Sequence, residues 1–134
     1  MAKLADIEGV GALSAARLKT AGIDTVEELL EKGASRTGRE TIAESTGISP
    51  KLILEWVNLA DLMRIKGVGE EFSDLLEEAG VDTVAELATR NGSNLYQKLT
   101  EINETKNLVR QLPGEAVVSG WVTQAQSLPR VVEY

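Results

Sequence analysis

The chain repeats itself, and this repeat constrains its fold more than any other feature of the sequence. Residues 7–29 match residues 65–87 at 12 of 23 positions, at an offset of 58. The likeness returns at Trp56 and Trp121, where the offset has grown to 65. About seven residues, roughly two helical turns, have therefore entered the second copy, and the segment after Asn91 is their expected place.

The repeat predicts the domain limits. We expect a first domain at residues 1–64 and a second at 65–134, with the insertion near 91–108. A long apolar stripe on a helix over residues 50–63 predicts that the two domains share this helix and pack as one compact unit. A third copy begins at Leu128 and stops, so we expect the tail Val131–Tyr134 to pack against the body of the protein.

Apolar residues recur at helical spacing almost everywhere, and no segment alternates as a strand does, so the fold class is all-α. Two glycines, Gly22 and Gly80, stand where left-handed caps would end the first helix of each copy. Thr25 with Glu28, and Thr83 with Glu86, have the spacing of a capping box. The helices are expected at residues 12–21, 37–45 and 50–63, at 70–79 and 93–108, after Thr25 and Thr83, and around Trp121. Both tryptophans are interpreted as core anchors rather than base-stacking platforms.

Composition removes several classes of function. The chain has no cysteine and no histidine, which excludes disulfides, thiolate catalysis, cysteine zinc sites and the usual general base. No apolar run has the length of a signal peptide or a membrane span, so we expect a cytoplasmic protein without a membrane anchor. The formal net charge is -7, which disfavours tight binding to a phosphate backbone.

A short glycine pattern occurs once in each copy. Two glycines that flank a small apolar residue, between two helices, form a tight turn whose backbone amides point outward at the start of the second helix. Such a turn can hold an anion. The pattern comprises Ile7, Gly9, Val10, Gly11, Ala15 and Leu18 in the first copy, and Ile65, Gly67, Val68, Gly69, Ser73 and Leu76 in the second.

This pattern resembles the helix-hairpin-helix motif. Nearly the whole chain is similar to a bacterial family of small tandem helix-hairpin-helix proteins that is catalogued as a domain of unknown function. The resemblance implies two tandem helix-hairpin-helix repeats of four short helices each, in a SAM-like bundle. In the broader class, hairpin amides and a nearby basic side chain hold the phosphates of duplex DNA without sequence preference, and hairpin carbonyls sometimes hold a monovalent cation. The resemblance implies no other cofactor.

Carried over by position, the resemblance predicts a nucleic-acid site on both hairpins. Further cations are expected near the first hairpin from Lys3, Arg36, Arg39 and Lys51. The predicted function is weak, sequence-independent binding of duplex nucleic acid by a non-catalytic module. The site residues are Gly9, Val10, Gly11, Ala12, Arg17, Lys19, Gly67, Val68 and Gly69.

The charge pattern keeps a second hypothesis open. Residues 1–22 carry a net charge of +1, whereas residues 64–80 carry -3. The second hairpin should therefore repel phosphate. A protein-interaction or scaffold module, in which the acidic helix from Glu70 to Glu78 meets a basic protein partner or a second copy, explains this charge better. A third interpretation is that the glycines serve only the chain reversal.

We expect no enzymatic activity and no small-molecule substrate. Some helix-hairpin-helix enzymes use a lysine that forms a Schiff base, but Lys19 and Lys32 lack the apolar setting that would lower the pKa of such an amine. The Gly9-x-Gly11 pattern has neither the third glycine of a dinucleotide site nor the glycine-lysine pair of a Walker loop.

Overall fold

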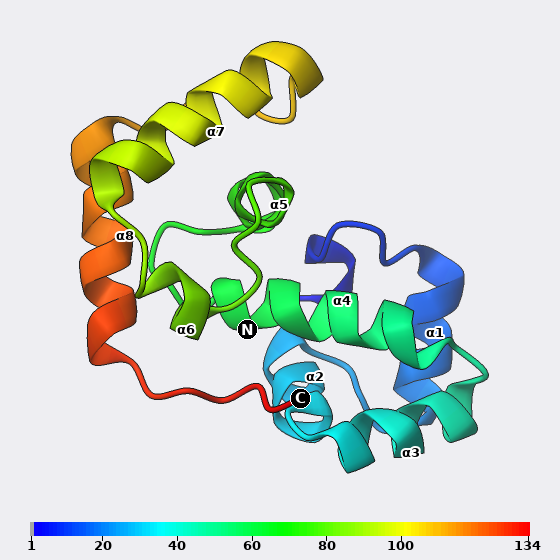
Figure 1. Cartoon of the computed structure of the whole chain (residues 1–134). Coiled ribbons are helices and arrows are strands. Elements are labelled where there is room, and N and C mark those ends of the chain that lie inside the picture. The colour runs from blue at the N-terminus through cyan, green and yellow to red at the C-terminus, as the bar shows by residue number, and fades with distance from the viewer. Residues whose placement is uncertain (1) are drawn as a thin grey trace. The chain divides into compact units, whose positions relative to one another are not determined.

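The computed structural model describes residues 2–134, and within them every named element is a helix (Figure 1). The all-α prediction is confirmed. The one strand-like contact among these residues is an isolated bridge between Lys3 and Thr25. Along the chain come the 3-10 helix η1 (Leu4–Asp6) and the α-helices α1 (Ala12–Thr20), α2 (Val26–Gly33), α3 (Arg36–Thr46), α4 (Pro50–Leu62), α5 (Glu70–Glu78), α6 (Val84–Leu87), α7 (Gly92–Lys106) and α8 (Glu115–Ser127).

The chain divides into two compact units. Unit 1 contains the residues up to Asp61 together with the tail Val131–Tyr134, and unit 2 contains Leu62–Arg130. The tail is packed as predicted, because Val132 is only 1% exposed and the Glu133 amide donates to the Ala34 carbonyl at 2.8 Å. The shared helix and the single compact packing of both repeats stay predictions.

Side-chain caps begin four of these helices, because the first amides of a helix have no acceptor inside it. The side chains of Thr25, Ser35, Thr83 and Asn91 each accept a hydrogen bond from the amide three residues on. The capping box at Thr25 differs in one detail from the prediction. The Glu28 carboxylate accepts from the amide of Asp24, one residue before the cap, and from the Thr25 hydroxyl, both at 3.2 Å.

The helix ends use glycine in the left-handed conformation, as predicted: φ is 84° at Gly22 and 87° at Gly80. The carbonyl of each of these glycines accepts a hydrogen bond from a basic side chain. Lys32 Nζ donates to the Gly22 carbonyl and Arg90 Nη2 donates to the Gly80 carbonyl, each at 3.0 Å. Lys32 therefore has a structural role at a helix C-terminus, where a positive charge is also stabilised by the helix dipole.

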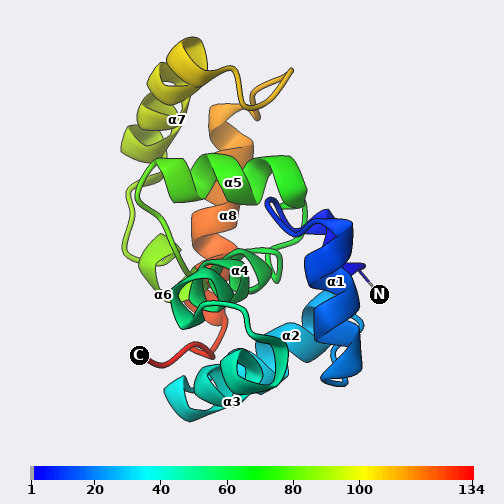
Figure 2. The same cartoon turned by 90° about the vertical axis from the view of Figure 1, so that its right-hand side faces the viewer.

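Each unit has its own apolar core, and a tryptophan lies in each. Trp56 and Trp121 are both 2% exposed, which confirms their interpretation as core anchors. In unit 2, Phe72 packs against Trp121 with ring centroids 5.4 Å apart. Figure 2 shows α5 along its length, lying across α8 of the same unit. On the apolar stripe predicted for α4, Leu52 is an exposed residue, at 37%.

The second copy differs from the first mainly between its third and fourth helices. Helix α7 has 15 residues where α3 has 11, and a loop at residues 107–114 replaces the short link at 47–49. Both lie after Asn91. In contrast, α4 and α8 have 13 residues each. Helix α6 has only 4 residues where α2 has 8.

Two glycines of unit 2 provide a matched test of this packing. A Cβ at Gly92 would lie 2.9 Å from Ser119 Cα, whereas a Cβ at Gly120 would meet nothing within 4 Å. We expect Gly92→Ala to lower the free energy of unfolding by about 1–3 kcal/mol through overpacking. Gly120→Ala, inside α8, should raise it by up to about 1 kcal/mol through helix propensity. Urea denaturation followed by circular dichroism measures both. Equal effects of the two substitutions would contradict the packing of α7 on α8.

Candidate nucleic-acid interface

The two glycine patterns form two turns with the same backbone path. We call residues 7–11, between η1 and α1, glycine turn 1, and residues 65–69, between α4 and α5, glycine turn 2. The first glycine has a φ of 90° in turn 1 and 93° in turn 2. The central valine amide then donates back across each turn, from Val10 to Ile7 and from Val68 to Ile65, at 3.1 Å. The second glycine is extended and serves as the N-cap of the next helix.

A tryptophan lies behind each turn. A Cβ added to Gly9 would be 3.4 Å from Trp56 Nε1, and one added to Gly67 would be 3.4 Å from Trp121 Nε1. Any other residue at these positions would have to adopt the left-handed backbone, which is unfavourable for a residue with a Cβ. The glycines are therefore required by the local structure whether or not the turns bind a ligand.

Turn 1 presents free backbone donors to solvent. Gly9, Gly11 and Ala12 are exposed, and within residues 2–134 no acceptor takes a hydrogen bond from their amides. The amides that open a helix lack intrahelical partners, and the helix dipole makes this end favourable for an anion. Val10 differs, because its side chain is 6% exposed and its amide is used within the turn. Its counterpart Val68 is buried in the same way, at 5% exposed, and its amide is also used within the turn.

An exposed leucine stands beside these donors. Leu13, in the first turn of α1, is 68% exposed, which is the largest exposure among the bulky apolar side chains of the described residues. No sequence pattern predicts this exposure, because an apolar residue in an amphipathic helix is ordinarily a core position. Leu13 places apolar surface next to the amides of turn 1.

Turn 2 has the same backbone but the opposite charge. Gly67 and Gly69 are exposed, yet Glu70 and Glu71 follow at once in the first turn of α5. Carboxylates at this position interact favourably with the helix dipole and repel an external phosphate. The carboxamide of Gln124 also accepts a hydrogen bond from the Lys66 amide at 3.0 Å. The predicted residues of turn 2 therefore have the backbone geometry of an anion site, but the carboxylates beside them disfavour a bound anion.

The predicted cations fall into two groups. Arg17 and Lys19 are exposed in the last turn of α1, about 7–8 Å and 10 Å along the helix axis from Ala12. Lys19 also lines a hollow of ≈ 330 Å³ together with Lys3 and Asp24. The structure thus brings Lys3 and Lys19 together beside α1.

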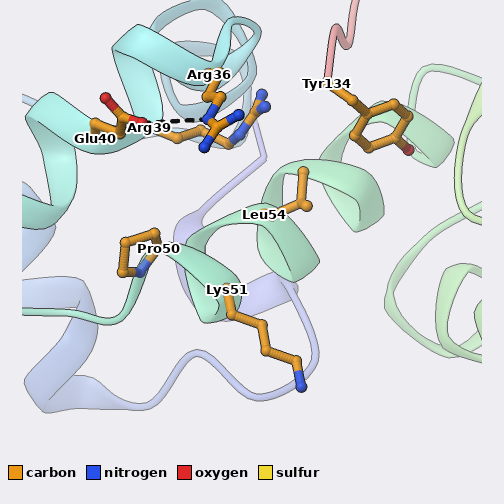
Figure 3. Close-up of a pocket in the computed structure, with 7 residues that line it drawn as sticks. All are labelled: Arg36, Arg39, Glu40, Pro50, Lys51, Leu54 and Tyr134. Atoms are coloured by element: carbon orange, nitrogen blue, oxygen red, sulfur yellow. Dashed lines mark hydrogen bonds and ion pairs between the residues drawn. The ribbon is translucent and has the colours of Figure 1, made fainter.

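The second group lines a different hollow of unit 1, with a volume of ≈ 460 Å³ (Figure 3). Arg36 lies beside Arg39 and pairs with Glu40 at 3.3 Å. Lys51 extends from α4 away from both arginines. The two hollows share no lining residue. They therefore do not show all these cations gathered around turn 1, as was expected.

Arg39 is a structural residue rather than a phosphate ligand. It is only 5% exposed, and its guanidinium donates to the carbonyls of Gly33 at 2.9 Å, Ala34 at 3.0 Å and Glu133 at 2.7 Å. Burial lowers the pKa of Arg39 from its usual value, because the charged form loses hydration. Its inclusion among the expected phosphate-binding cations was wrong, because its buried guanidinium donates to carbonyl oxygens inside unit 1.

Within the described part of the chain, no three acidic side chains gather closely enough to hold a metal ion. No helix among residues 2–134 has both the length and the apolar character needed to cross a membrane.

Comparison with protein families gives a match over most of the chain. Residues 8–128 match the family described as "Domain of unknown function (DUF4332)". The chain belongs to this family. The match covers turn 2 and all of turn 1 except Ile7, and the DUF4332 description assigns no activity. No curated protein matches the chain, and no solved structure does either.

The two neighbouring arginines of α3 allow a matched test of the role of Arg39 in this DUF4332 protein. We expect Arg39→Met to lower the free energy of unfolding by about 2–4 kcal/mol, because it removes buried hydrogen bonds made by a charged group. Arg36→Met removes an exposed ion pair and should change the free energy of unfolding by less than about 0.5 kcal/mol. Urea titrations of both variants measure this difference. A stable Arg39→Met variant would show that the guanidinium is dispensable and would return Arg39 to the list of free cations.

Proposed function

We propose that this DUF4332 protein is a non-catalytic, cytoplasmic module of two tandem helix-hairpin-helix repeats that binds duplex nucleic acid weakly and without sequence preference. Phosphate oxygens are held by the backbone amides of glycine turn 1. Glycine turn 2 is a structural copy that takes no part in binding. In this assignment η1, turn 1 and α1 form the first hairpin, and turn 2 with α5 belongs to the second.

The observation that carries the proposal is the state of turn 1. Gly9, Gly11 and Ala12 are exposed residues, and their amides donate to no acceptor in the described residues. Such donors at the start of a helix suit a phosphate oxygen. The residues that follow, Ala12 and Leu13, carry no negative charge, unlike Glu70 and Glu71 at the same place in turn 2.

Nearby cations support the same site. Arg17 and Lys19 are exposed on α1, and Lys3 lies with Lys19 on one hollow of unit 1. Arg39 is removed from the set by its burial. We expect roughly two to four phosphate contacts. The logarithm of the affinity should then fall with the logarithm of the salt concentration with a slope of about -2 to -4. The net charge of -7 keeps the affinity low.

Proline at the first helical position tests the amide donors directly. Ala12 is the first residue of α1 and follows an extended Gly11, with φ -83° and ψ 177°, so Ala12→Pro removes one N–H without opposing the helix. We expect this variant to lose about tenfold in affinity for a labelled duplex at about 50 mM salt, because one charge-assisted hydrogen bond is lost. Fluorescence anisotropy measures the change.

The matched control is Glu70→Pro, at the first helical position of α5 after the extended Gly69. It removes the equivalent amide of turn 2 together with a negative charge, so binding should stay the same or become slightly tighter. Unchanged affinity in Ala12→Pro, or a loss in Glu70→Pro as large as in Ala12→Pro, would contradict the assignment to turn 1.

A second candidate function follows from α5. Its exposed carboxylates include Glu70, Glu71 and Glu78, and Glu78 pairs with Lys106. This surface suits a basic protein partner better than a phosphate backbone. A duplex titration separates the two candidates: no anisotropy change at about 50 mM salt with tens of micromolar protein would leave only the protein-interaction module.

A further inference from the structure

One hollow of unit 1 gathers positive charge, although the chain has a formal net charge of -7. It lies between α3 and α4 with Tyr134 at one side, and its volume is ≈ 460 Å³ (Figure 3). We call it the α3–α4 hollow. Its lining includes three basic side chains, Arg36, Arg39 and Lys51, and one acidic side chain, Glu40. Its volume lies within the range of small-molecule sites, which is about 300–1,000 Å³.

Other hollows in the described part of the chain have a different charge. A hollow of ≈ 430 Å³ in unit 2 is lined by Glu101 and Glu115 and by no basic side chain. Another hollow of unit 2, of ≈ 500 Å³, is lined by one residue of each sign, Glu71 and Arg110. An excess of basic side chains is therefore a particular property of the α3–α4 hollow, and it favours an anionic ligand there.

The guanidinium of Arg39 lines this hollow without a carboxylate partner. Arg39 is 5% exposed, and its three hydrogen bonds go to backbone carbonyls, which carry no formal charge. A guanidinium has five N–H donors, and among residues 2–134 no acceptor takes those that remain. Glu40 pairs with Arg36 instead, at 3.3 Å. Because a buried charge without a counterion is unfavourable, an anion that enters the hollow is attracted to Arg39.

The rest of the lining is apolar or aromatic. Pro50 opens α4, Leu54 follows one turn later, and the ring of Tyr134 belongs to the tail. A simple inorganic anion would leave these surfaces in contact with water. A ligand with a flat apolar body would cover them, and an aromatic ring suits the ring of Tyr134. The lining therefore favours an anion that carries an aromatic body.

We propose that the α3–α4 hollow binds a small aromatic carboxylate, with the carboxylate toward Arg36 and Arg39 and the ring against Leu54 and Tyr134. An arginine fork matches the two oxygens of a carboxylate. Arg39 keeps its structural hydrogen bonds and contributes its charge. The site shares no lining residue with the hollow beside α1, and it does not depend on the proposed binding of nucleic acid.

Cinnamate is a suitable probe, because its neutral amide has almost the same shape. Titration of the labelled protein, followed by the backbone amide resonances, should show shifts in α3 and in the first turns of α4. The expected dissociation constant for a ligand of this size is on the order of 1 mM. Cinnamamide should bind about tenfold more weakly, because the charge-assisted hydrogen bonds are lost. Acetate, which has no ring, should cause no shift at the same concentration. Equal binding of cinnamate and cinnamamide, or no shift at ten times the expected dissociation constant, would overturn the proposal.

Two substitutions of the half-buried Leu54 test the charge of the site without touching the arginines. Glutamate and glutamine have similar helix propensities, so both variants should retain α4. Leu54→Glu places a carboxylate in the hollow and should weaken cinnamate at least about tenfold, because like charges repel. Leu54→Gln removes the same apolar surface without adding charge and should weaken it only about threefold. The same loss in both variants would contradict the assignment of an anion site.

The exposed Arg36 provides a test that does not depend on how Leu54 variants fold. Arg36→Met should stay folded, because it removes only an exposed ion pair. It should weaken cinnamate about threefold and leave cinnamamide unchanged, because only the carboxylate loses a partner. An equal effect on both compounds, or no effect on cinnamate, would contradict the placement of the carboxylate.

Discussion

Each glycine turn packs against the indole of a buried tryptophan. Trp56 Nε1 and Trp121 Nε1 are each 3.4 Å from the position of a Cβ on Gly9 and Gly67. The buried tryptophan, the left-handed glycine and the next helix form one local unit, and this unit occurs twice. Gly11 and Gly69, which cap the next helix in each copy, are exposed. The fold thus produces two sets of helix-opening amide donors for structural reasons before any ligand is considered.

The two sets differ only in the side chains around them. Turn 1 is followed by Ala12 and Leu13, and turn 2 by Glu70 and Glu71. The helix dipole at turn 2 already has carboxylates of its own chain beside it, which stabilises α5 and removes the attraction for phosphate. The duplicated backbone therefore has the same turn geometry in both copies, and only turn 1 lacks carboxylates at the start of the helix that follows. The same duplication preserves the basic caps Lys32 and Arg90 at the carbonyls of Gly22 and Gly80.

The features that the sequence predicts correctly are local ones. Caps at Thr25 and Thr83, left-handed glycines at Gly22 and Gly80, and the all-helical class depend on residues a few positions apart. The role of Arg39 could not be predicted in this way, because one of its acceptors is the Glu133 carbonyl, 94 residues away. The exposure of Leu13 could not be predicted for a related reason. Helical periodicity shows which residues share one face of a helix, but tertiary packing decides whether that face is covered.

Nuclear magnetic resonance of the backbone amides tests the central claim most directly, because it observes the proposed donors themselves. A uniformly labelled sample titrated with a short duplex at low salt should show progressive shifts of the Gly9, Gly11 and Ala12 amides. The Gly67 and Gly69 amides, which share the same backbone geometry, should stay unchanged. Equal shifts at both turns, or shifts confined to residues outside turn 1 and α1, would contradict the account.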